Sequence, residues 1–134
     1  MGENTKNFIL DASVILTILL PDEKNLKEAK KIVKILGVKN NKFFAPSLLE
    51  FEVCNSIKSS IIRKRIKVES IDEIISNFNS IKILFLEIDK NKTINFALKN
   101  NLSFYDASYL YLAKINKCKL LTLDKKLERI VNEK

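Results

Sequence analysis

Four acidic side chains, Asp11, Glu52, Asp106 and Asp124, lie within or at the end of apolar stretches of a chain that contains no histidine. Carboxylates are rarely buried unless they are paired with a positive partner. Because the chain offers no histidine and only two cysteines, the partner that several carboxylates would most readily share is a hard divalent cation such as Mg²⁺ or Mn²⁺. The pattern therefore predicts metal-assisted chemistry on phosphate.

The composition excludes several other kinds of site. Without histidine there is no Ser-His-Asp or Cys-His site, no histidine general base and no histidine-ligated zinc. The glycines are Gly2 and Gly37 alone, so both the P-loop and the glycine-rich dinucleotide fingerprint are absent.

The length of 134 residues predicts a single domain spanning residues 1–134. The net charge of +8 around an acidic pocket suits a polyanionic partner such as nucleic acid, although a basic surface also serves solubility alone. Cys54 and Cys118 lie in apolar contexts, which predicts buried thiols in a reducing compartment. The apolar run Phe8–Leu20 is interrupted by Asp11, so we interpret it as part of the mature fold, and we expect a cytoplasmic protein with no membrane span.

The four acids need elements that bring them together, and the chain alternates short strands with helices. Strands are predicted at 7–10, 43–45, 82–88 and 120–123, and helices at 11–20, 24–36, 46–65, 71–81, 92–99 and 105–117, with a short helix from Asp124. This alternation predicts an α/β fold, a short central parallel sheet with helices on both faces. Asp11 and Asp124 then follow strands, and Asp106 opens a helix. All three can meet beyond the carboxyl ends of the strands, with Glu52 reaching in from the side.

Each of these acids has a structural alternative. Asp11, Asp106 and Asp124 could each satisfy the free N–H groups at a helix N-terminus, and for Asp124 taken alone this is the better interpretation. In the helix that follows Pro46, helical projection favours Glu52 over Glu50 only slightly. Glu52 shares its stripe with Leu48, Asn55, Ser56 and Ser59, and Asn55 could orient its carboxylate.

Four motifs in order resemble the PIN-domain ribonucleases, and most closely the VapC-type toxins of prokaryotic toxin–antitoxin pairs. The motifs cover essentially the whole chain. They are Leu10-Asp11-Ala12-Ser13, then Pro46 followed by Glu52-Val53-Cys54-Asn55, then Tyr105-Asp106-Ala107-Ser108-Tyr109, and finally Leu120 to Asp124 with Thr122 between.

The resemblance implies a fold, an activity and a set of site residues. Asp11, Glu52, Asp106 and Asp124 would be catalytic and would bind Mg²⁺ or Mn²⁺, which resolves the choice between Glu50 and Glu52 in favour of Glu52. Ser13, Asn55 and Thr122 would hold the carboxylates or the phosphate by hydrogen bonds, without binding the metal themselves. The expected reaction is hydrolysis of RNA that leaves a 5′-phosphate and a 3′-hydroxyl, and the expected partners are an antitoxin protein and a second copy of the chain.

Basic and aromatic side chains are further candidates for RNA contact. Lys125 and Lys126 follow Asp124, whereas Arg63 and Arg65 follow the Glu52 helix, and solvation of a helix face is the competing interpretation. The aromatic side chains of 104–111 are expected in the core, except Tyr105, which could stack on a base. A non-catalytic nucleic-acid-binding or scaffold module stays open as an alternative. A phosphoryl-transfer enzyme is less favoured, because Ser13 stands where one such class needs a second Asp.

Overall fold

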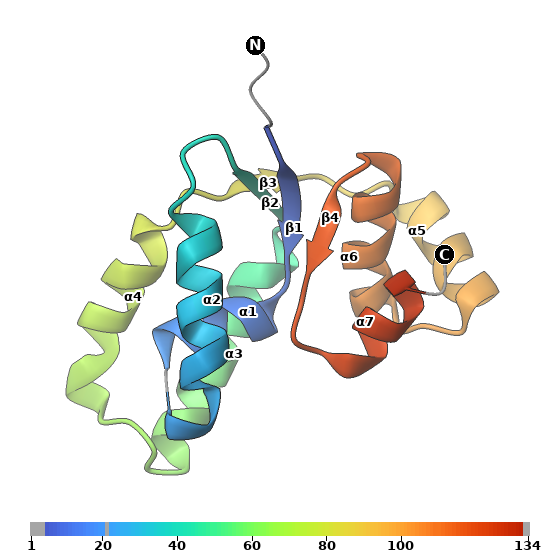
Figure 1. Cartoon of the computed structure of the whole chain (residues 1–134). Coiled ribbons are helices and arrows are strands. Elements are labelled where there is room, and N and C mark those ends of the chain that lie inside the picture. Colours follow the sequence, from blue (N-terminus) through green and yellow to red (C-terminus); the bar gives the residue numbers. More distant parts are fainter. Residues whose placement is uncertain (1–4, 21, 133–134) are drawn as a thin grey trace.

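A parallel sheet lies between two layers of helices in the computed structural model, which describes residues 5–20 and 22–132 (Figure 1). Within these residues the sheet has four strands, all parallel, in the spatial order β3-β2-β1-β4. Their bounds are β1 Asn7–Leu10, β2 Lys42–Pro46, β3 Leu84–Leu86 and β4 Lys119–Leu121. The predicted α/β fold with helices on both faces is confirmed.

The strand order creates a switch point between β1 and β4. The chain runs from β1 to β2 and on to the edge strand β3, and then crosses back to place β4 on the other side of β1. In open α/β sheets, ligands bind beyond the carboxyl ends of strands at such a point. Asp11 directly follows β1, and Asp124 lies three residues after the end of β4.

The helices divide between the two faces of the sheet (Figure 1). One layer holds α1 Ala12–Leu19, α2 Leu26–Leu36, α3 Leu48–Ile62 and α4 Ile71–Ser80, with short 3₁₀ turns at Glu23–Asn25 and Val68–Ser70. The other layer holds α5 Lys90–Asn100, α6 Phe104–Ile115 and α7 Lys125–Asn132.

Two apolar cores lie on opposite faces of the sheet because successive side chains of a strand point in opposite directions. Phe8 and Leu10 of β1 pack into the core beneath α1 to α4, whereas Ile9 between them packs into the core beneath α5 to α7. β1 is therefore buried on both faces, as a continuous apolar strand of a parallel sheet should be.

The ends of several elements differ from the sequence prediction. Helix α3 ends at Ile62 rather than Arg65, because Lys64 adopts a left-handed conformation and the Arg65 N–H bonds back to the Ser60 carbonyl at 2.8 Å. This is a Schellman-type ending, and a lysine in place of the usual glycine conceals it from sequence reading. The third strand covers only Leu84–Leu86 of the predicted 82–88.

The prediction of two buried thiols was wrong for Cys54. Cys54 is exposed on α3, while Cys118 is half-buried. An apolar sequence context did not establish burial, because Cys54 lies on the outer side of its helix, beside the exposed Phe51. Among the described residues, no helix is long and apolar enough to cross a membrane.

Candidate active site

Asp11 is a buried carboxylate at the junction of β1 and α1, only 4% exposed. Its Oδ1 accepts hydrogen bonds from the Ser13 hydroxyl at 2.6 Å and from the Val14 N–H at 3.3 Å. Its Oδ2 accepts a short hydrogen bond from the Thr122 hydroxyl. Asp11 is therefore the N-cap of α1, and its second oxygen is held by Thr122, the residue directly after β4.

A small network ties the end of β4 to the end of β1. The Ser13 hydroxyl, which donates to Asp11, accepts from the Leu123 N–H at 2.9 Å. The Thr122 hydroxyl, which also donates to Asp11, accepts from the Asp124 N–H at 3.0 Å. Each of the two hydroxyls thus forms a hydrogen-bonded bridge between the Asp11 carboxylate and the backbone of residues 123–124.

Asp124 caps α7, as the structural alternative predicted. Its Oδ1 accepts from the N–H groups of Lys126 at 2.9 Å and Leu127 at 3.3 Å. These bonds use one oxygen and leave the carboxylate partly open to solvent, since Asp124 is exposed. Capping and a role in the site are compatible, because a helix N-terminus favours the ionised carboxylate.

Glu52 reaches the site from the second turn of α3. Its Oε1 accepts a hydrogen bond of 2.5 Å from the hydroxyl of Tyr109 on α6, a residue 57 positions away in sequence. Glu50 is exposed. Of the two glutamates left open by helical projection, Glu52 is the one that faces α6.

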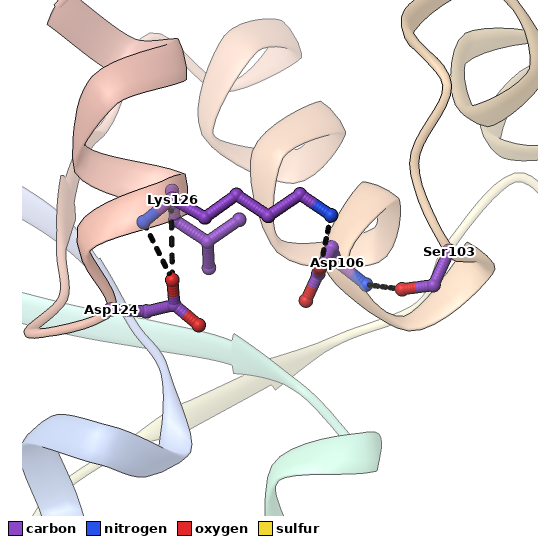
Figure 2. A network of polar contacts seen from close by, with 5 residues as sticks. Ser103, Asp106, Asp124 and Lys126 are labelled. Carbon is purple, nitrogen blue, oxygen red and sulfur yellow. Dashed lines mark hydrogen bonds and ion pairs between the residues drawn. The ribbon is translucent and has the colours of Figure 1, made fainter.

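Asp106 lies in the first turn of α6 and faces Asp124 across a gap that Lys126 spans (Figure 2). The helix is capped by the Ser103 hydroxyl, which accepts from the Asp106 N–H at 3.0 Å. The ammonium of Lys126 lies 3.9 Å from Asp106 Oδ2. This pair is solvent-accessible, with the lysine side chain 58% and the aspartate side chain 30% exposed.

The four carboxylates share one electrostatic neighbourhood. Burial raises the pKa of Asp11, and the charge of Asp124 raises it further, against the lowering effect of the hydrogen bonds from Ser13, Thr122 and Val14. Burial also raises the pKa of Glu52, where the charges of Asp11 and Asp106 add to the effect and the Tyr109 hydrogen bond opposes it. Burial and the neighbouring Glu52 raise the pKa of Tyr109, so its hydroxyl stays protonated and remains a donor.

The chain matches a known protein family. The PIN domain family matches residues 8–133 of the chain. The chain is a PIN domain. It is 27% identical over 124 residues to Ribonuclease VapC3 of Pyrobaculum aerophilum, covering 89% of this chain and 90% of that protein. The crystal structure of PAE2754 from Pyrobaculum aerophilum superposes with a TM-score of 0.68 at 22% identity, over 95% of this chain and 81% of that chain, which supports the fold.

The donor set of this PIN domain suits a hard divalent ion. All four acids and the neighbouring hydroxyls offer oxygen. The pKa of Glu52 is raised by burial and, to a smaller extent, by the negative charges of Asp11 and Asp106, which a cation would offset. As they stand, no three Asp, Glu, His or Cys side chains within residues 5–20 and 22–132 lie close enough to hold an ion jointly. Mg²⁺ commonly takes only one or two carboxylates and completes its shell with water and phosphate oxygens, so the residues fit an ion held in that way.

The other residues proposed from sequence lie at different distances from the four acids. Ser13 and Thr122 bond Asp11 directly. Asn55 is exposed on α3. It was expected to orient the Glu52 carboxylate, but the hydrogen bond to that carboxylate comes from Tyr109. Arg63 and Arg65 lie at the far end of α3 from Glu52, whereas Lys126 reaches Asp106 and Lys125 is exposed at the start of α7.

Tyr109 is the residue whose role in the site sequence reasoning missed. The sequence predicts it in the core, and it is indeed only 2% exposed. A buried tyrosine usually finds a partner for its hydroxyl, and three positions after Asp106 it lies on almost the same side of the helix. That spacing is the signal that could have identified it.

Proposed function

We propose that this PIN domain is a divalent-metal-dependent endoribonuclease, the toxin of a VapC-type toxin–antitoxin pair. The observation that carries the proposal is the meeting of Asp11, Glu52, Asp106 and Asp124, from four different elements, in one electrostatic neighbourhood at the switch point of the sheet. The similarity to Ribonuclease VapC3 supports RNA as the substrate.

Asp11 and Asp106 are the principal candidates to hold the ion, with Glu52 and Asp124 completing its surroundings. When bound, such an ion lowers the pKa of a water molecule and offsets charge on phosphate oxygens. Ser13 and Thr122 orient Asp11 and favour its ionised form against the effect of burial, because their hydrogen bonds are made to the charged carboxylate. Tyr109 does the same for Glu52. Without a histidine, no imidazole base is available to the reaction.

A polar groove offers a path for the RNA backbone away from the acids. Ser56 and Ser59 follow Glu52 along one side of α3, so the groove begins about one helical turn beyond the carboxylate. It has a volume of about 680 Å³ between α1, α3 and α4; its far end carries Arg63 and Arg65, and Asp22 and Glu73 also line it. Lys125 and Lys126 flank the acids from the other side, at the start of α7. Basic side chains at both ends suit a strand that crosses the site.

The proposed toxin role implies protein partners. An antitoxin would inhibit by placing a basic side chain among the four carboxylates. The position of Lys126 beside Asp106 supports this, because an ammonium already sits at the edge of the cluster. A homodimer is proposed on the same family grounds.

The decisive experiment incubates purified protein with structured and unstructured RNAs in Mn²⁺, Mg²⁺ or EDTA. We expect cleavage with either metal, none in EDTA and none from Asp11→Asn, with products that carry a 5′-phosphate and a 3′-hydroxyl. RNA binding that persists in EDTA without any cleavage in metal would favour a non-catalytic binding module instead. Unimpaired cleavage by Asp11→Asn would refute the assignment of the site.

A further inference from the structure

A second cavity is lined in part by the first turns of α3 and α6, the helices that carry Glu52 and Asp106. It is formed where the carboxyl ends of β2 and β3 meet the first turns of α3 and α6, and its volume is about 610 Å³. Tyr105 in its wall is adjacent to Asp106 in sequence, and Leu48 is one helical turn before Glu52 on α3. Residues of the cavity wall therefore stand within one helical turn of Asp106 on α6 and of Glu52 on α3.

Aromatic side chains are unusually exposed at this cavity. Phe85 of β3 is 42% exposed, and Phe104 and Tyr105 of α6 are 36% and 60% exposed. All three line the cavity. Aromatic rings usually bury a large apolar area, and these rings are distributed around a concavity instead of packing in the core.

Polar side chains stand among these rings. Ser47 and Ser108 offer hydroxyls, Glu87 a carboxylate and Lys90 an ammonium. The Ser108 hydroxyl already donates to the Tyr105 carbonyl at 2.7 Å, which braces the first turn of α6. A flat apolar ligand with hydrogen-bonding edges and a nearby phosphate would satisfy the rings, the carboxylate and the ammonium together.

We infer that this cavity is a nucleobase subsite, in which an unpaired base of the RNA next to the cleaved phosphate stacks on Tyr105 and Phe104. The inference rests on the proposed ribonuclease function and names its substrate as a single-stranded segment. Base stacking on aromatic side chains tolerates every base, so Glu87 would supply preference through the exocyclic amino group of a cytosine or a similar donor edge. Lys90 would contact the flanking phosphate.

The test measures binding separately from cleavage. Short single-stranded RNAs that carry 2-aminopurine are titrated in EDTA against the wild-type chain, Tyr105→Ala, Tyr105→Phe and Phe104→Ala. We expect Tyr105→Ala to bind about 5- to 100-fold more weakly, Phe104→Ala to bind more weakly as well, and Tyr105→Phe to bind nearly as the wild type, because the ring is kept. Leu98→Ala removes an exposed apolar side chain on α5, outside the cavity lining, and should leave binding unchanged.

An RNA with one abasic position completes a double-mutant cycle. Removing the base that enters the cavity should weaken wild-type binding by the same factor as Tyr105→Ala and should cost the Tyr105→Ala variant nothing further. Additive losses at every abasic position would overturn the subsite. A shift of Tyr105→Ala from dimer to monomer in light scattering, with RNA binding intact, would overturn it too, because the rings would then serve contact between copies.

The outcomes separate this inference from the proposed function. Metal-dependent cleavage with no effect of Tyr105→Ala on binding or on the cleavage position refutes the subsite alone. Binding that depends on Tyr105 in a chain that never cleaves RNA supports the subsite and refutes the ribonuclease. A wild-type chain that neither binds single-stranded RNA nor cleaves RNA in the presence of metal refutes both.

Discussion

The four acids form two pairs that the fold holds in different ways. Asp11 and Asp124, the strand pair, follow β1 and β4 and are connected through Ser13, Thr122 and backbone N–H groups. Glu52 and Asp106, the helix pair, project from α3 and α6, where Tyr109 and Lys126 contact them through side chains alone. The strand pair is therefore tied to backbone at the ends of β1 and β4, whereas each acid of the helix pair is contacted by a side chain from another helix.

This difference suggests a division of labour within the proposed active site. The hydrogen bonds that hold Asp11 fix the position of one proposed ligand of the ion, whereas Glu52 and Asp106 are held by fewer contacts. Buried hydrogen-bonded groups also cost more to disturb than exposed ion pairs. The following substitutions test the comparison, beginning with the largest expected effect.

Asp11→Asn should reduce cleavage by more than about 100-fold, because it alters a proposed metal ligand itself. The same change should raise the melting temperature at neutral pH, because it removes a buried charge that is repelled by Asp124. Activity and thermal unfolding are measured on the same preparation, the latter in EDTA.

The stability gain of Asp11→Asn should depend on pH. The pKa of Asp11 is raised in the folded protein, so the folded chain takes up its proton at a higher pH than the unfolded chain. The wild type therefore loses stability relative to the variant as the pH rises from the unfolded pKa through the raised folded pKa. Below both values the difference should become small, and a pH-independent difference would contradict a charge-based cause.

Thr122→Val should lower cleavage by about 10- to 100-fold, because it removes the hydroxyl that donates to Asp11 and accepts from the Asp124 N–H. We also expect a loss of about 1–3 kcal/mol in the free energy of unfolding, since buried partners are left unpaired. Chemical denaturation measures it.

Thr93→Val is the matched control for that loss. Thr93 is fully buried, and its hydroxyl has no hydrogen-bond partner in the part of the chain that the structure describes. The same substitution there should be neutral or stabilising. Equal destabilisation at both threonines would show that the Thr122 network carries no special weight.

Tyr109→Phe should reduce cleavage by about tenfold, less than Thr122→Val, because only one bond to the helix pair is lost. Since Glu52 is partly accessible, water can replace the hydroxyl, and the unfolding free energy should change by about 1 kcal/mol or less. Single-turnover cleavage rates at saturating metal provide the measurement. A larger loss than that of Thr122→Val would reverse the proposed ranking of the two pairs.

Lys126→Gln should have the smallest effect. Its ion pair with Asp106 is exposed, so the free energy of unfolding should change by no more than about 0.5 kcal/mol. If Lys126 contacts a phosphate of the RNA, the dependence of log binding constant on log salt should become shallower by about 0.7. Lys30→Ala, an exposed change on α2, should leave that slope unchanged.

The architecture could be predicted from sequence because its determinants are local. Runs such as Phe8 to Leu10 alternate with helical periods, and in a parallel sheet all carboxyl ends meet at one edge. Asp11 and Asp124 therefore had to lie near each other once β1 and β4 were neighbours. The ends of α3 and β3 were less predictable. At the end of α3, Lys64 adopts a left-handed conformation that lysine rarely takes.

What the sequence alone determined is which side chains carry acid and at which edge of the sheet they gather. Only the tertiary structure decided how each is held: Glu52 by Tyr109 and not by Asn55, Asp106 beside Lys126, and Tyr105 turned outward beside a cavity. The physical reason is that these contacts depend on how α3, α6 and α7 are rotated and packed against one another. No periodicity within a single segment encodes that rotation, since it is settled by the filling of the two cores on either side of the sheet.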